Sequence, residues 1–372
     1  MMNNQKIFDR GIRNISGCGL IGMINKNGVK VGGEIIKKSI VLLNDRGNGL
    51  GAGYAAYGIY PDYKNLYAFH LMYDSKKSLD ETEEYLKKNC IIENKEMIPI
   101  NPKAINNSHP ILKRYFLQPV LNINESTHET GKIEEDDQIV RIVMNINEHI
   151  DGAYVFSSGK NMGAFKGVGF PSEIADFYKI DEYEGYIWVG HTRFPTNTPG
   201  WWGGAHPFTL LDWAIIHNGE ISSYGINKRY LEMFGYKLTL MTDTEVATYL
   251  LDLLIRKHKL SIKTACTILA PPFWKDIDKC DNLDNNYLKK LRMVYGSASL
   301  NGPFAIFFAH KRGLVGFNDR VKLRPLVIGT KDESVYMSNE QSAIYVLCET
   351  PDRVWTPKAS DPVIVSLNEN VN

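Results

Sequence analysis

The segment Ser16-Gly17-Cys18-Gly19-Leu20-Ile21-Gly22-Met23-Ile24 places a cysteine among small residues, directly before an apolar run. A short apolar run of this kind is typical of a buried strand. Cys18 is therefore expected at the start of a strand, where a nucleophile could sit. The alternative interpretation is a buried structural cysteine that follows a disordered tail.

The residues before Cys18 distinguish a lipoprotein signal sequence from a polar propeptide. Ile15-Ser16-Gly17-Cys18 resembles a bacterial lipoprotein cleavage site, but residues 1–14 carry charged side chains and contain no apolar signal stretch. The remaining functional interpretation is a polar propeptide, residues 1–17, whose removal makes Cys18 the first residue. A free α-amino group has a pKa of about 8, against about 10.4 for lysine, so an N-terminal cysteine would carry its own general base.

Composition excludes several classes of protein. The 372 residues include 43 Lys+Arg and 42 Asp+Glu, giving a net charge of +1, so the chain lacks the basic surplus of a nucleic-acid-binding protein. No stretch approaches the roughly 20 apolar residues of a membrane span. The five cysteines are scattered without a CxxC pair, which argues against a metal centre. We expect a soluble, cytoplasmic protein with no metal and neither nucleic acid nor membrane as a partner.

A run of glycines follows the first predicted helix, residues 33–43. Gly47, Gly49, Gly51 and Gly53 lead into a predicted strand over residues 54–60. This order of helix, glycines and strand is the reverse of a dinucleotide fingerprint, and no Gly-Lys-Ser/Thr phosphate loop is present. The glycine run is therefore not expected to bind a nucleotide.

The rest of the chain is predicted to mix strands and helices. Residues 66–165 are interpreted as an α+β insertion, with a helix over 78–88 and strands over 67–73 and 138–144. Asn218-Gly219 is expected to form the turn of a hairpin over 213–224. Thr242-Asp243-Thr244-Glu245 matches a capping box that opens a helix. The predicted main domain thus comprises residues 18–65 and 166–372, and its last third is rich in strands.

Several motifs occur together in a fixed order. Cys18 stands in CGLIG and Arg46-Gly47 follows; Arg193 stands in HTRFPTNT, Asn218-Gly219 in HNGEI and Asp243 in TDTE. Arg193, Asn218 and Asp243 are spaced at intervals of 25 residues. The set resembles the class II glutamine amidotransferases, whose glutaminase domain is an N-terminal nucleophile hydrolase. The resemblance implies an α+β fold, a four-layer αββα sandwich, here with an insertion.

The resemblance also implies a role for each motif residue. Cys18 would be the nucleophile, and the Asn218 side-chain amide with the Gly219 N–H would stabilise the oxyanion. Arg193 would hold the α-carboxylate of L-glutamine and Asp243 its ammonium group. The residues expected to line or support the site are Thr196 and His206 in the pocket and Arg46 as a salt-bridge partner behind the nucleophile strand.

Within the family, RFPTNT, HPF and HNGEI most resemble the amidotransferase portion of glutamate synthase, as a stand-alone subunit of the archaeal type. The chain has Ala205-His206-Pro207-Phe208 and a Ser222-Ser223 pair where the large glutamate synthases have AQPF and HNGEINT. No flavin, iron-sulfur or nucleotide motif occurs in the sequence, so no cofactor is expected on this chain. A second subunit is therefore expected to use the ammonia, most simply an FMN-dependent glutamate synthase or a related N-substituted glutamate synthase. The alternatives are a non-catalytic scaffold that retains its propeptide and a free-standing amidase.

Overall fold

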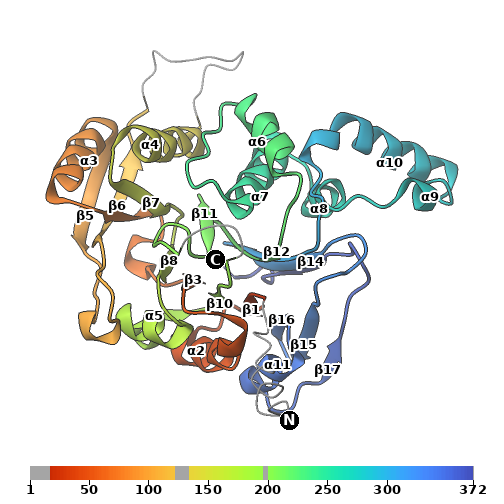
Figure 1. Cartoon of the computed structure of the whole chain (residues 1–372), viewed down its shortest axis with the longest axis horizontal. Coiled ribbons are helices and arrows are strands. Elements are labelled where there is room, and N and C mark those ends of the chain that lie inside the picture. Colours follow the sequence, from red (N-terminus) through yellow and green to blue (C-terminus); the bar gives the residue numbers. More distant parts are fainter. Residues whose placement is uncertain (1–16, 122–133, 196–199, 372) are drawn as a thin grey trace, which may run out of the picture.

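The computed structural model describes residues 17–121, 134–195 and 200–371, and two antiparallel sheets form its centre (Figure 1). The first has seven strands in the order β17-β15-β16-β1-β10-β3-β8. Its strands in chain order are β1 (Gly19–Asn25), β3 (Ala52–Tyr57), β8 (Met162–Gly167), β10 (Ile187–Thr192), β15 (Val327–Lys331), β16 (Ser334–Ser338) and β17 (Arg353–Trp355). The strand that follows Cys18 is therefore hydrogen-bonded on both sides, to β10 and β16.

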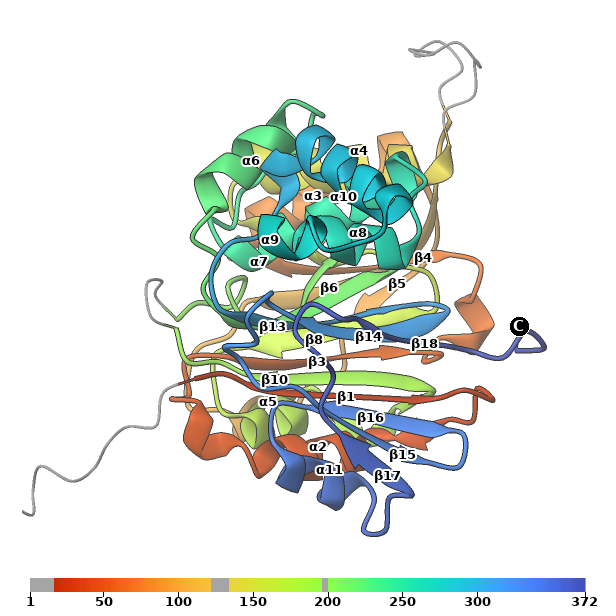
Figure 2. The same cartoon turned by 90° about the vertical axis from the view of Figure 1, so that its right-hand side faces the viewer.

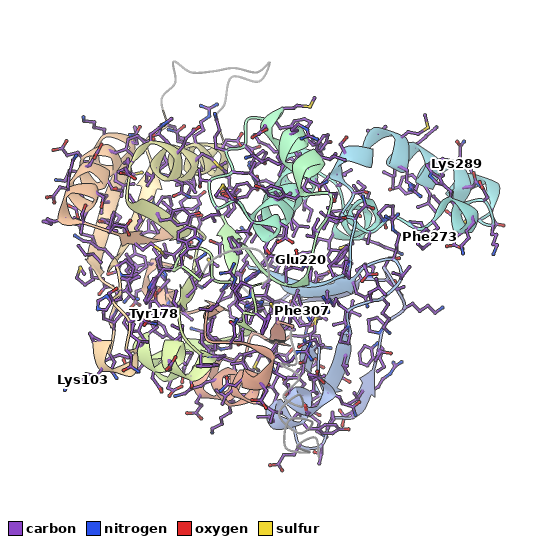
Figure 3. All side chains as sticks on the ribbon, in the orientation of Figure 1. Lys103, Tyr178, Glu220, Phe273, Lys289 and Phe307 are labelled. Atoms are coloured by element: carbon purple, nitrogen blue, oxygen red, sulfur yellow. The ribbon has the colours of Figure 1, made fainter. Side chains whose placement is uncertain are left out.

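The second sheet lies face to face with the first. It has the order β11-β12-β13-β14-β18, formed by β11 (Phe208–Leu210), β12 (Trp213–Gly219), β13 (Phe304–His310), β14 (Gly313–Asn318) and β18 (Val363–Ser366). Apolar side chains from both sheets form one core, in which Phe307 is fully buried near the centre of the molecule (Figure 3).

Helices cover the outer faces of both sheets (Figure 2). On the first sheet lie α2 (Gly33–Val41), α5 (Pro171–Phe177) and α11 (Gln341–Leu347). Over the second lie α6 (Tyr224–Glu232), α7 (Asp243–Leu251) with its π-helical extension Asp252–Lys257, and α8 (Ile262–Leu269), and beyond them α9 (Trp274–Ile277) and α10 (Asn282–Val294). This layering confirms the predicted αββα sandwich.

A separate four-stranded sheet, in the order β5-β6-β4-β7, stands beside the sandwich with two helices. Its elements are β4 (Tyr67–Tyr73), α3 (Lys76–Asn89), β5 (Cys90–Met97), β6 (Ile111–Pro119), α4 (Glu135–His149) and β7 (Ala153–Ser157); β2 (Val31–Gly32) and β9 (Glu184–Gly185) form a small ladder elsewhere. The strand predicted over 138–144 is wrong, because α4 covers it. Buried Ile139, Ile142, Val143 and Ile146 follow helical spacing, which outweighs the strand preference of β-branched residues.

The hairpin predicted over 213–224 is also wrong. Asn218 and Gly219 are the last residues of β12, which pairs with β11 and β13, and Tyr224 already begins α6. Gly219 is nevertheless required, since its φ is +146° and a Cβ there would lie 1.9 Å from the Pro303 carbonyl oxygen.

The glycine run that leads into β3 and ends at Gly53 within it allows backbone segments to approach closely. A Cβ on Gly47 would lie 2.1 Å from Thr192 Oγ1, and one on Gly53 would lie 2.3 Å from the carbonyl oxygen of His206. The run therefore packs against the segments that carry Arg193 and His206. In the described ranges, none of the helices has the length and apolar character required to cross a bilayer.

Candidate active site

Cys18 is fixed through its backbone immediately before β1. Its carbonyl oxygen accepts hydrogen bonds from Arg46 Nε at 3.2 Å and from Asn339 Nδ2 at 2.8 Å. Arg46 also forms an ion pair with Glu340, and Asn339 Oδ1 accepts from the Leu20 amide at 2.9 Å. Residues from two distant parts of the sequence thus hold the cysteine in place.

The Cys18 thiol accepts a backbone hydrogen bond and is under the electrostatic influence of Arg193. Phe194 N–H donates to Sγ over 3.4 Å. Burial raises the pKa of the Cys18 thiol, and the Phe194 amide and the nearby Arg193 only partly offset that effect. The thiol is therefore protonated at neutral pH, and a base would have to remove its proton for it to act as a nucleophile. In the part of the chain that the structure describes, no histidine or carboxylate is hydrogen-bonded to Sγ.

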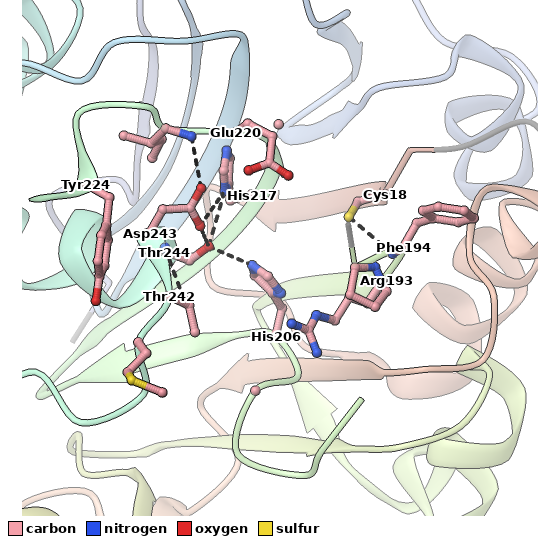
Figure 4. Close-up of a pocket in the computed structure, with 15 residues that line it drawn as sticks. Cys18, Arg193, Phe194, His206, His217, Glu220, Tyr224, Thr242, Asp243 and Thr244 are labelled. Atoms are coloured by element: carbon pink, nitrogen blue, oxygen red, sulfur yellow. Dashed lines mark hydrogen bonds and ion pairs between the residues drawn. The ribbon is translucent and has the colours of Figure 1, made fainter. Parts of the chain in front are cut away.

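A cavity of about 260 Å³ opens beside the thiol (Figure 4). Its wall combines an arginine, two carboxylates, two histidines and backbone groups from β12 and the start of α7. The lining residues are Cys18, Arg193, Phe194, Pro195, Gly204, His206, His217, Gly219, Glu220, Ile221, Tyr224, Met241, Thr242, Asp243 and Thr244.

Arg193 brings a buried positive charge to this cavity. Its amide donates to the Gly51 carbonyl at 2.8 Å, and its carbonyl accepts from Asn48 at 3.3 Å, so the glycine run fixes its backbone. Only 5% of the residue is exposed. Burial lowers the pKa of Arg193, but a guanidinium keeps its charge in proteins.

Asp243 supplies the opposite charge from the N-terminus of α7. Thr242 caps that helix, with its hydroxyl accepting from the Thr244 and Glu245 amides. Asp243 Oδ2 accepts from the Ile221 amide at 3.0 Å, and Oδ1 lies 3.7 Å from His217 Nδ1. Burial alone would raise the pKa of Asp243, but His217 and these hydrogen bonds lower it overall, so the group stays a carboxylate. A cation and a carboxylate on one small cavity suit a zwitterionic amino acid.

Thr244 joins two histidines behind Asp243. Its Oγ1 lies 2.9 Å from His206 Nε2 and 3.2 Å from His217 Nδ1 (Figure 4). The His206 ring stacks on His191 with centroids 4.0 Å apart. Burial lowers the pKa of His191 to about 3 and that of His206 well below its usual range, so both are neutral. His217 and Thr244 were not predicted as site residues, although they stand in the HNGEI and TDTE motifs.

Asn218 lies close to Gly17, the residue before Cys18, and is not among the residues that line the cavity. A Cβ on Gly17 would be 3.9 Å from Asn218 Oδ1. Asn218 is 1% exposed, and its Nδ2 has no hydrogen-bond partner in the described ranges. A buried donor without a partner costs free energy, which makes this amide a candidate for a group that acts on a reacting atom. Gly219 lines the cavity directly, whereas Thr196 lies outside the described residues.

The fold and this site together define a class of protein. An αββα sandwich with a cysteine before a central strand of one sheet is the architecture of the N-terminal nucleophile hydrolases. The family model described as "Glutamine amidotransferases class-II" matches residues 67–355, most of the chain. The chain belongs to this family. Cys18 and Arg46 precede the matched segment.

The chain is similar both to a relative of about its own length and to a longer one. An uncharacterized protein of Archaeoglobus fulgidus is 49% identical over 93% of this chain and 91% of its own length. An amidophosphoribosyltransferase of Methanocaldococcus jannaschii is 28% identical over 51% of this chain and 36% of its own. A solved structure of the allosteric regulatory enzyme of purine biosynthesis covers 94% of this chain at 16% identity and a TM-score of 0.47. The chain spans about half the length of that structure.

Proposed function

We propose that this chain is a glutaminase subunit that hydrolyses the side-chain amide of L-glutamine through Cys18 after residues 1–17 have been removed. The observation that carries the proposal is the cavity of about 260 Å³ in which the Cys18 thiol, Arg193 and Asp243 meet. Arg193 binds the α-carboxylate and Asp243 the α-ammonium group. These two contacts direct the side-chain amide toward the thiol.

The proposed reaction proceeds in two steps. The free α-amine of Cys18 accepts the thiol proton, Sγ bonds to the amide carbon, and Asn218 Nδ2 and the Gly219 N–H stabilise the oxyanion. The C–N bond then breaks, and the α-ammonium returns its proton to the leaving ammonia. Water hydrolyses the resulting thioester, which releases glutamate and regenerates the thiol. The raised pKa of the Cys18 thiol supports a mechanism with an adjacent base.

The ammonia is proposed to pass to an FMN-dependent synthase subunit of the glutamate synthase type. The motifs around Arg193 and Asn218, RFPTNT and HNGEI, support this partner through their resemblance to the glutamate synthase amidotransferase portion. A glutaminase that hydrolysed glutamine without a synthase to use the ammonia would consume glutamine without benefit. We therefore expect the partner to raise the rate of glutamine hydrolysis.

Ammonia release tests the proposal directly. The purified chain should release ammonia from glutamine and not from asparagine, slowly when alone and faster with a flavoprotein recovered by tagged co-purification. Release at full rate with no flavoprotein recovered would favour a free-standing amidase. No release under either condition, from a chain that retains residues 1–17, would favour a scaffold.

Changes at the two charged residues should weaken glutamine binding before they slow chemistry. Arg193→Lys loses the planar pair of donors, and Asp243→Asn loses the charge that faces the ammonium group. A hydrogen bond to a charged group contributes about 1.5–3 kcal/mol, so KM for glutamine should rise roughly 10- to 100-fold, with a smaller fall in kcat. Steady-state kinetics measure both constants. The exposed pair Arg353→Lys and Asp361→Asn are matched controls, and a fall in kcat alone at Arg193 and Asp243 would contradict these roles.

A further inference from the structure

Lys166 is an ionisable side chain in the interior of the sandwich. It belongs to β8 and is 1% exposed. Its Nζ donates to the Gly203 carbonyl oxygen at 2.9 Å and lies 4.5 Å from the centre of the Phe208 ring. Burying an amine costs free energy unless its hydrogen bonds compensate. Packing alone therefore does not explain why a lysine occupies this buried position.

The carbonyl that Lys166 holds belongs to a turn packed by two tryptophans. The Trp201 ring lies over Gly203 and Gly204, where added Cβ atoms would come within 2.2 and 2.5 Å of it. The Trp202 ring lies on Gly167 of β8, 2.5 Å from where a Cβ would stand. Apolar contacts thus pack the turn against β8, and the Lys166 amine adds a hydrogen bond to the Gly203 carbonyl oxygen.

This turn leads straight into the wall of the Cys18 cavity. Gly204 and His206 line the cavity, one and three residues after Gly203. A Cβ on Gly53 would lie 2.3 Å from the His206 carbonyl oxygen and 2.7 Å from Lys166 Cβ, so these segments are in tight contact. A shift of the Gly203 carbonyl would consequently move Gly204 and His206.

We propose that Lys166 is a positioning residue for glutamine: by holding the Gly203 carbonyl, it keeps Gly204 and His206 in the wall of the binding cavity. This inference rests on the proposed function. Burial lowers the pKa of Lys166 to about 7. To a smaller extent, the Glu245 carboxylate raises this pKa and the Arg193 charge lowers it. An amine donates hydrogen bonds whether charged or neutral, so the anchor persists in both states.

The test replaces Lys166 with methionine, which keeps the stem and removes the donor. For Lys166→Met, KM for glutamine should rise at least tenfold, with kcat within threefold of wild type. The melting temperature should change little, because removing a buried amine offsets the loss of its hydrogen bond to the buried Gly203 carbonyl. Protection of Cys18 against iodoacetamide by glutamine reports occupancy of the site through a readout other than ammonia release. Lys160→Met is the matched control, since Lys160 pairs with Glu135 at the surface near β8.

Two results would overturn the proposal. One is an unchanged KM and unchanged protection in a folded Lys166→Met protein. The other is a lower melting temperature with kcat reduced and KM unaltered, which is the signature of a purely structural residue. If Lys166→Met does not fold, Gly203→Ala decides, because it displaces the same turn and must raise KM. Wild-type protein that shows neither protection nor ammonia release would refute the glutaminase function instead.

Discussion

Cys18→Ala should reduce glutamine hydrolysis to the background rate, because the thiol is the atom that forms the proposed thioester. Losing the nucleophile of a hydrolase can cost roughly 10⁶-fold in turnover. The melting temperature should change little, since the residue stands before β1 and contributes a small side chain. Ammonia release and thermal unfolding give the two measurements.

The matched control is Cys280→Ala, which removes an exposed cysteine and should leave the rate unchanged. Intact mass provides a second check, because active protein should begin at Cys18 if its α-amine is the base. Fully active protein that retains Met1 would contradict the proposed mechanism, as would substantial activity in Cys18→Ala.

Asn218→Ala should lower kcat about 10²- to 10³-fold with little change in KM, the range seen when one oxyanion donor is removed. The reason is that an oxyanion exists only near the transition state. In the described part of the resting protein, Nδ2 donates to no partner, so removing it sacrifices no hydrogen bond of the folded state. Steady-state kinetics separate the two constants.

Two further variants sharpen this prediction. Asn218→Asp keeps the shape of the side chain but replaces the donor with an acceptor, and should lose at least as much turnover. Asn27→Ala, at an exposed position, should match wild type. A rise in KM of the same size as the fall in kcat at Asn218 would mean that the amide binds the substrate rather than the transition state.

Local patterns predicted the parts of the fold that local physics determines. The apolar run after Cys18 forms β1, and Thr242 caps α7 as expected. The capping box itself is incomplete, because the Glu245 carboxylate accepts from the Thr239 and Leu240 amides instead of from the cap residue. The Asn218-Gly219 pair misled because its turn preference is overridden by pairing with β13, a contact between residues about ninety positions apart.

The residues of the candidate site that stand in sequence motifs were predictable. Those that the tertiary structure brings to the cavity from elsewhere were not. The motifs containing Arg193 and Asp243 indicated two groups that the structure places on one cavity. Lys166 carries no such signal, because its sequence neighbours Phe165 and Gly167 are those of an ordinary strand. Its environment arises from the turn after Trp201, which sequence patterns do not connect to β8.

The backbone contacts of Cys18 have a consequence for the order in which the protein is made. Asn339, which donates to the Cys18 carbonyl, and β16, which pairs with β1, lie more than three hundred residues further along the chain. While the chain is still emerging from the ribosome, Cys18 is therefore present before Asn339 and β16, which hold it in position, have been made. Cys18 reaches its final position only after Asn339 has been synthesised and β16 has paired with β1, so the proposed thiol-dependent reaction waits until that part of the sheet has formed.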